Sequence, residues 1–303
     1  MLSRRDVCKL AVGALAMPAI GAKKIDSVVH GVQFGLQSYI FTGIGLPQEG
    51  LVEVVIRSMA ETGLGECDLY APLVEPAQFS DRIRGADSAA ARAQAREELA
   101  RWRATVSLDY FRPIRKKFED AGIAIYGLSG FPGSTEEELG RTFDIAEVLG
   151  ARLITLSFGL AAAKRVAPLV EKRGFLVGIQ GNPNMSVTNP DAIAKPESYE
   201  QAVSLSRNYQ ISFDIGDATG GGYDALKFVE DHHDRIGLLY LKDRRKDRVS
   251  VPYGEGDTHV AEILHLIRDR KYQFRCYLDC DYKTTDRPAD VKRSFEFAKA
   301  ALS

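Results

Sequence analysis

Four polar residues in the second half of the chain end short apolar segments, and their types suit a charged catalytic site. They are Gln180, Asp214, Lys242 and Asp279, and the segments lie between residues 175 and 281. In a (β/α)8 barrel, the residues at the carboxyl ends of the strands converge at one face. Two carboxylates and an amide oxygen can hold a hard divalent cation, and an ammonium group can stabilise negative charge on a ligand. The sequence therefore predicts one site built from an amide, two carboxylates and an ammonium, with no histidine among them.

The elements that must position these residues alternate between strand and helix. After the first 22 residues, apolar runs alternate with helical patterns eight times, which is typical of parallel βαβ units. The expected strands are 32–39, 65–70, 123–129, 153–158, 175–180, 211–215, 236–242 and 274–281. Eight parallel strands close into a barrel, so we expect a single-domain α/β protein, a (β/α)8 TIM barrel. An open doubly wound sheet is the alternative, but it usually carries a phosphate-binding glycine turn, and Gly127-Leu128-Ser129-Gly130 is not one.

The widest gap between expected strands carries helical patterns of its own. Residues 86–103 are rich in alanine, arginine and glutamate and predict an exposed helix, and residues 107–121 predict a second. These insertions either shape a rim over the site, form a homo-oligomer contact, or are solvated charged helices. Gly122, Gly150 and Gly174 each precede a strand, and they predict left-handed helix ends.

The amino-acid composition limits which classes of protein this chain can belong to. The chain has 303 residues, 45% of them hydrophobic, and a formal net charge of −1. These values suit one large globular domain with an ample core. Nothing in the charge balance favours a nucleic-acid partner.

The first residues predict an export signal. The pair Arg4-Arg5 precedes an apolar run at 11–20 and small residues after it, as in a twin-arginine signal with a nearby cleavage site. We therefore expect a signal at 1–22, a barrel at 23–303, and a periplasmic or secreted protein. The apolar run is too short to span a bilayer, so no membrane span is expected. An ordinary amphipathic N-terminal helix is the alternative.

Three cysteines remain after the expected signal. Cys67, Cys276 and Cys280 each lie within an apolar, strand-like run. Small thiols are common in such buried positions, so we expect packing residues and no disulfide framework.

Several stretches together resemble the sugar phosphate isomerase/epimerase family. These are the xylose-isomerase-like TIM barrels that include ketose 3-epimerases and endonuclease IV relatives. The resemblance covers essentially the whole chain after residue 22 and is carried by residues 35–39 (GLQSY), 102–122, 149–151, 178–183 (GIQGNP), 214–217 (DIGD), 239–243 (LYLKD), 251–257 (VPYGEGD) and 278–281 (LDCD). It implies the barrel fold, and the export signal fits a secreted or periplasmic subgroup of the family.

The resemblance also implies a metal centre. The family typically places a divalent metal on Glu or His at the fifth strand, Asp at the sixth, His at the seventh and Glu at the eighth. The matching positions here are Gln180, Asp214, Tyr240 and Asp279, and only Asp214 is the usual residue. We expect Asp214, Asp279 and Gln180 to be the ligands of Mn²⁺ or Mg²⁺, held weakly because the ligand set is incomplete. Asp214 could instead cap a helix.

The histidines argue against two related chemistries. His30, His232, His233, His259 and His265 all fall outside the expected strand ends. A histidine-containing zinc or manganese site is therefore not expected. Endonuclease-type DNA repair is disfavoured as well, because it needs several histidines and a basic surface.

The resemblance implies removal of a proton next to a carbonyl, with the enediolate stabilised by a cation. Asp279 is then the candidate base and Lys242 its electrostatic partner. Gln180 cannot take a proton, which favours one-base isomerisation or β-elimination over two-base epimerisation.

Two assignments stay open at this point. Asp281 points to the same side of its strand as Asp279 and competes with it for the role of base or ligand. Lys242 could pair simply with Asp243 or with the loop of Glu255.

Other polar and aromatic residues at strand ends are candidates for substrate binding. Tyrosines there either stack on a sugar ring or pack the barrel mouth, and an Asn-Pro-Asn loop either binds hydroxyls or forms an ordinary turn. The candidates are Tyr39, Asp68, Tyr70, Ser129, Ser157, Asn182 and Tyr240.

Two functions compete. The first is an exported isomerase, epimerase or lyase that abstracts a proton next to the carbonyl of a keto-sugar or keto-glycoside with divalent-metal assistance. The second is a catalytically degenerate sugar-binding barrel with an eroded metal site. In both, the partner is a small-molecule carbohydrate.

Overall fold

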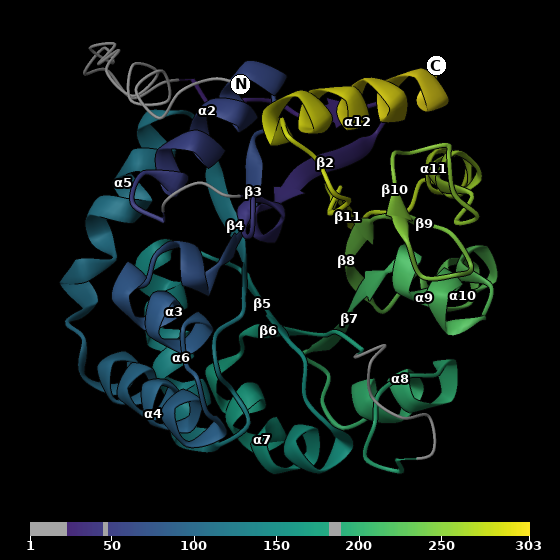
Figure 1. Ribbon diagram of the computed structural model, residues 1–303. Coiled ribbons are helices and arrows are strands. Elements are labelled where there is room, and N and C mark those ends of the chain that lie inside the picture. The colour runs from purple at the N-terminus through teal and green to yellow at the C-terminus, as the bar shows by residue number, and fades with distance from the viewer. Residues whose placement is uncertain (1–22, 45–47, 182–188) are drawn as a thin grey trace.

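Eight parallel strands form a closed barrel surrounded by helices (Figure 1). The computed structural model describes residues 23–44, 48–181 and 189–303. The barrel closes because β2 pairs with β3 on one side and with β11 on the other. The strands are β2 (Val32–Gln37), β3 (Glu66–Tyr70), β4 (Ala124–Ser129), β5 (Leu153–Leu156), β6 (Leu176–Ile179), β7 (Tyr209–Asp214), β8 (Ile236–Leu241) and β11 (Arg275–Leu278). The predicted (β/α)8 fold is confirmed.

All eight predicted strands are present, with shifted ends. Most of them stop one or two residues earlier than expected, since the polar residues that follow belong to loops at the barrel mouth. β7 begins two residues earlier than predicted, at Tyr209, whose ring is fully buried and whose hydroxyl donates to the carbonyl of Ala163 at 2.6 Å. Three short strands were not predicted: β1 (Val28–Val29), β9 (Asp243–Arg244) and β10 (Ser250–Val251).

The helices pack around the outside of the barrel, as Figure 1 shows. They are α2 (Leu51–Thr62), α3 (Ala77–Arg84), α4 (Ala89–Thr105), α5 (Arg112–Asp120), α6 (Glu136–Leu149), α7 (Leu160–Arg173), α8 (Pro196–Val203), α9 (Ile215–Gly221), α10 (Ala225–His232), α11 (Val260–Arg270) and α12 (Arg287–Leu302). The core lies between these helices and the strands. Within the described ranges, no helix is both long and apolar enough to cross a membrane.

The predicted helices before β4 begin later than the sequence pattern suggested. α4 starts at Ala89 because the side chain of Ser88 accepts the backbone N–H of Ala91, which caps the helix. The pattern at 107–121 is split into a short 3-10 turn and α5. Pro113 explains the split, since proline lacks an N–H and is tolerated only in the first turn of a helix.

Two smaller predictions are confirmed. Gly122, Gly150 and Gly174 have left-handed backbone angles, with φ of 75°, 79° and 66°. The cysteines of the described region are free and buried, as expected for packing residues.

The barrel interior contains polar layers. At the amino ends of the strands, Glu66 accepts hydrogen bonds from Arg275 at 2.8 Å and from the hydroxyl of Tyr277 at 3.0 Å. One layer higher, the hydroxyl of Tyr240 donates to Oδ2 of Asp68 at 2.6 Å. Above this layer, at the carboxyl ends, the barrel opens into a polar hollow.

Candidate functional site

A hollow of about 520 Å³ lies at the carboxyl ends of the barrel strands. Its lining brings together residues that are far apart in the sequence. Eight of the predicted site residues border it: Tyr39, Tyr70, Ser129, Ser157, Gln180, Asp214, Lys242 and Asp279. Gln37, Thr155, Asp217, Arg244 and Asp281 also line the hollow.

The centre of the hollow is an ammonium group among three carboxylates. Nζ of Lys242 lies 2.7 Å from Oδ2 of Asp214, 3.0 Å from Oδ2 of Asp279 and 3.3 Å from Oδ2 of Asp281. The lysine side chain is only 8% exposed. Lys242 pairs with neither Asp243 nor Glu255, the two partners considered from the sequence. The carboxylate of Asp243 instead accepts backbone N–H groups of its own loop.

Strand register explains why these four groups meet. β8 lies between β7 and β11 in the barrel. Leu278 pairs with Leu241, so Asp279 and Lys242 follow side by side at the ends of β11 and β8. Asp214 ends β7 opposite Tyr240 of β8. Asp281 lies two residues beyond Asp279 and also reaches the ammonium.

Asp214 has two functions in this arrangement. Its Oδ1 atom accepts the backbone N–H groups of Gly216 at 2.9 Å and Asp217 at 3.0 Å, which caps helix α9. Its Oδ2 atom faces Lys242. The helix cap and the site residue, which the sequence left as alternatives, are the same carboxylate.

The charges in the hollow shift the acidity of its groups. Burial raises the pKa of Asp279 to about 8, in spite of the neighbouring Lys242. Burial opposes the charge on Lys242, but the carboxylates of Asp214, Asp279 and Asp281 outweigh it and raise the lysine pKa well above its ordinary value. Burial acts on Asp281 too, yet Lys242 keeps its pKa below the ordinary value. The site therefore combines a permanent cation with a carboxyl group that can exchange a proton near neutral pH.

A second ion pair lies beside the first and was missed in the sequence. Nη1 of Arg244 lies 2.7 Å from Oδ1 of Asp217. Burial, together with the nearby Asp214, raises the pKa of Asp217 to about 7. The signal was present, since Arg244 lies two residues after Lys242 and points to the same side of the chain.

The predicted metal ligands do not fit a divalent cation. The space between Asp214 and Asp279 holds the ammonium of Lys242, and Oε1 of Gln180 accepts a hydrogen bond from Ser157 at 3.4 Å. Across the described part of the chain, histidines, cysteines and acidic residues form no group of three or more that is arranged to hold a metal ion. Tyr240, which was matched to a metal-ligand position in the sequence, instead donates to Asp68 inside the barrel.

Asp68 and Tyr240 lie beneath the hollow and do not border it. Both are fully buried, and the hydroxyl of Tyr240, which gives its one proton to Asp68, also lies 3.1 Å from Oγ1 of Thr155. Oγ1 of Thr155 is 2.8 Å from Oγ of Ser212. Burial raises the pKa of Asp68 to about 6, although Tyr240 donates to the carboxylate. The structure places these two predicted substrate-binding residues in a buried network one layer below the site.

The remaining candidates within the described residues lie on the wall of the hollow. The rings of Tyr39 and Tyr70 meet edge to face at 5.1 Å, and Tyr39 is 41% exposed. Nε2 of Gln37 donates to Oγ of Ser129 at 3.3 Å. Asn182 lies outside the described residues.

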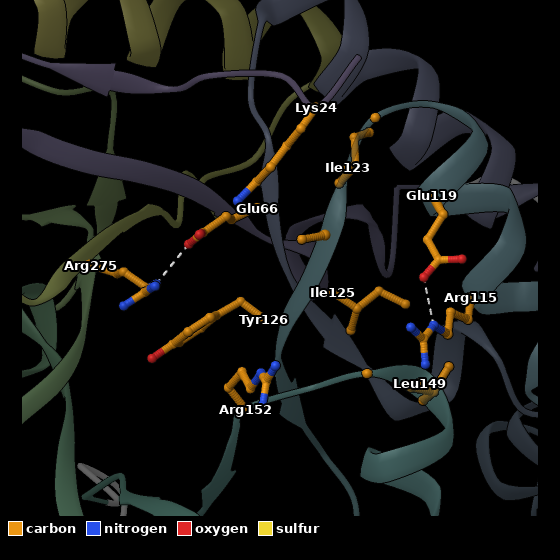
Figure 2. A pocket seen from close by; sticks show the side chains of 13 residues that line it. Lys24, Glu66, Arg115, Glu119, Ile123, Ile125, Tyr126, Leu149, Arg152 and Arg275 are labelled. Carbon is orange, nitrogen blue, oxygen red and sulfur yellow. Dashed lines mark hydrogen bonds and ion pairs between the residues drawn. The ribbon is translucent and has the colours of Figure 1, made fainter. Parts of the chain in front are cut away.

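Another hollow, shown in Figure 2, lies at the opposite end of the barrel. Four basic side chains and two acidic ones line it, but Glu66 is paired with Arg275 and Glu119 with Arg115, as Figure 2 shows. The active sites of such barrels are built at the carboxyl ends of the strands, and the amino ends serve stability. The hollow around Lys242 is therefore the candidate site.

Comparison with solved structures agrees with the fold. Similar structures include a D-tagatose 3-epimerase-like protein, with 16% identity, a TM-score of 0.61, and coverage of 89% of this chain and 97% of that chain. A 3-keto-D-glucoside 4-epimerase from E. coli has 12% identity, a TM-score of 0.61, and coverage of 89% and 99%. A D-allulose 3-epimerase from Methylomonas sp. has 12% identity, a TM-score of 0.59, and coverage of 91% and 99%. No protein-family model and no curated protein matches the chain.

Proposed function

We propose that this protein is a sugar isomerase or epimerase-like enzyme that moves a proton at a carbon next to a carbonyl group. The observation that carries the proposal is the position of Lys242 beside Asp279 in a polar hollow at the barrel mouth. Solved structures of similar fold include two proteins whose names are sugar epimerases, which supports a carbohydrate as the ligand class.

The lining of the hollow suits a small polyhydroxylated ligand. Ser129, Ser157 and Gln180 offer hydroxyl and amide groups to sugar hydroxyls. The exposed ring of Tyr39, held edge to face against Tyr70, offers an apolar surface for the C–H face of a sugar. A hollow with this many charged groups disfavours an apolar ligand.

Proton transfer in the site starts with Asp279 as the base. Asp279 borders the hollow, and its buried Oδ1 atom has no hydrogen-bond partner among the described residues. The carboxylate takes the proton, the electron pair of the C–H bond forms a carbon–carbon double bond, and the carbonyl oxygen gains negative charge. The ammonium of Lys242 stabilises that charge. Asp279 then returns the proton to the former carbonyl carbon, while the hydroxyl proton of the neighbouring carbon passes to the charged oxygen. The carbonyl group thus forms on the neighbouring carbon, which completes a one-base isomerisation.

Lys242 suits the stabilising function because it stays charged. The surrounding carboxylates raise its pKa well above the ordinary value. Lys242 therefore remains an ammonium throughout the pH range in which Asp279 gains or loses its proton. A fixed donor in a site that excludes water stabilises a developing oxyanion more strongly than the same donor in bulk solvent.

Deuterium exchange tests the proposal. Ketoses such as D-tagatose and D-allulose, and a 3-keto-D-glucoside, would be incubated with the protein in D₂O, and deuterium at the carbon next to the carbonyl would be measured by NMR. We expect exchange with the unmutated protein and none with Asp279→Asn. Asp231→Asn, which removes a helix-surface carboxylate paired with Lys227, is the matched control and should exchange normally.

A sugar-binding barrel without catalysis is the second candidate. It is favoured by the pairing of Lys242 with three carboxylates, which satisfies the ammonium before any ligand arrives. Calorimetry separates the two functions. Sugar binding without deuterium exchange would support the binding protein and contradict the enzyme.

We also propose that the protein is exported to the periplasm or secreted. The support is the sequence pattern at residues 1–22, which lie outside the described structure. Replacing both Arg4 and Arg5 with lysine should retain the protein in the cytoplasm, as measured by cell fractionation. Unchanged export of that variant would contradict a twin-arginine signal.

A further inference from the structure

The cluster around Lys242 has the form of a cation site whose cation is part of the chain. Three carboxylate oxygens, from Asp214, Asp279 and Asp281, surround one nitrogen at 2.7 to 3.3 Å. The positive charge of one ammonium thus faces three carboxyl groups. The side chains of Asp214 and Asp279 are 2% and 5% exposed, so solvent does little to compensate their charge.

A divalent ion and this lysine would need the same oxygens. Mg²⁺ binds carboxylate oxygens at about 2.0 to 2.1 Å, which would bring the ion close to a nitrogen already in contact with those oxygens. Two cations at such a separation repel each other strongly inside a protein, where screening is weak. The ammonium and the ion are therefore alternative occupants of one position.

The backbone is shaped to admit the lysine. A Cβ atom at Gly216 would lie 2.8 Å from Cγ and 3.0 Å from Cβ of Lys242, which is closer than carbon atoms approach in proteins. The first turn of α9 thus leaves room for the lysine stem only because residue 216 is glycine. This contact is independent of the ion pairs, and it shows that the lysine occupies a place built for it.

We propose that the ammonium of Lys242 replaces the divalent cation in this barrel, and that removing it lets Asp214, Asp279 and Asp281, which are not arranged around a metal ion in the described structure, close on a divalent cation. The inference concerns the same site as the proposed function, but it does not depend on which reaction takes place there. Oδ1 of Asp279 and Oδ1 of Asp281 are buried without hydrogen-bond partners among the described residues, so oxygen atoms remain free to coordinate an ion once the lysine is gone.

Calorimetric titration with Mn²⁺ tests the proposal without any substrate. The unmutated protein should bind no Mn²⁺ at this site. Lys242→Ala should bind one ion, with an affinity at least about tenfold above the weakest that the titration detects, because three carboxyl groups are then left without their cation. Lys227→Ala, at a surface ion pair on α10, is the matched control and should behave as the unmutated protein does.

A second variant shows whether the Mn²⁺ is bound by the carboxyl groups of this cluster. In Lys242→Ala combined with Asp279→Asn, the gained Mn²⁺ affinity should fall back by about tenfold or more, because one charged ligand is lost. The proposal is overturned if folded Lys242→Ala, checked by circular dichroism, gains no affinity. It is equally overturned if the unmutated protein binds one Mn²⁺ that Asp214→Asn abolishes, and that measurement requires no lysine variant. None of these experiments measures enzyme activity, so their failure would be distinguishable from failure of the proposed reaction.

Discussion

Nζ of Lys242 lies 2.7 Å from Oδ2 of Asp214, while the other oxygen of the same carboxylate caps helix α9. One side chain thus fixes both the start of a helix and the position of the central cation. Substitutions at Asp214 should separate the two functions.

Asp214→Asn keeps an oxygen for the helix cap but removes the charge beside Lys242. Asp214→Ala removes both. We expect Asp214→Ala to be less stable than Asp214→Asn by about 0.5 to 2 kcal/mol, the usual contribution of a cap. Urea denaturation measures both variants. Equal stabilities would show that the two backbone hydrogen bonds of Asp214 contribute little.

Gly216→Ala should disturb the lysine. The added methyl group would meet the stem of Lys242, so we expect a loss of about 1 to 3 kcal/mol in the free energy of unfolding, together with weaker deuterium exchange. Gly140→Ala, on helix α6, where an added Cβ atom would have no neighbour within 4 Å, is the matched control and should leave stability unchanged or raise it by up to about 1 kcal/mol. If Gly216→Ala and Gly140→Ala had the same free energy of unfolding, the stem of Lys242 would have to move aside freely.

Asp68 should make stability depend on pH. Its pKa in the folded protein is raised to about 6, above the ordinary 3.8, so the folded state holds this proton more tightly than the unfolded chain. The contribution of Asp68 is therefore fully present below pH 4 and is lost as pH rises through 6, by about 3 kcal/mol in all. Urea denaturation at pH 4 and pH 7.5 should show a smaller decline for Asp68→Asn than for the unmutated protein. A decline of the same size in both would place the titrating group elsewhere.

Asp279 should control the pH dependence of proton exchange. Because a base must be ionised and burial raises its pKa to about 8, the exchange rate should rise with pH and level off above about 8. Lys242 stays protonated throughout this range, so no loss at high pH is expected from it. Deuterium exchange measured between pH 6 and 9.5 gives the profile. A rate independent of pH over this range would assign the base to another group.

Much of the fold could be predicted from the sequence, because each strand is a short apolar run closed by a polar residue. The glycines that end the helices indicated where the following strands begin, and all eight strands are present in the structure. The split at Pro113 was missed because the helical pattern runs through it, and the backbone N–H that proline lacks decides the boundary.

The sequence predicted which residues belong to the site better than it predicted which of them touch one another. Asp214, Lys242 and Asp279 were expected at one face, and they lie together there. The partners of Lys242 were open, because they depend on the register between β7, β8 and β11, which no local pattern reveals. Tyr240 lies two residues before Lys242 and points to the same side, but one layer deeper, so it contacts Asp68 beneath the hollow.

The most direct test of the central claim is deuterium exchange into a keto-sugar after exhaustive treatment of the protein with a chelator. We predict that exchange continues at an undiminished rate in the chelated protein and is lost in Asp279→Asn, because the cation of the site is Lys242. Exchange that stops on chelation and returns with added Mn²⁺ would contradict it.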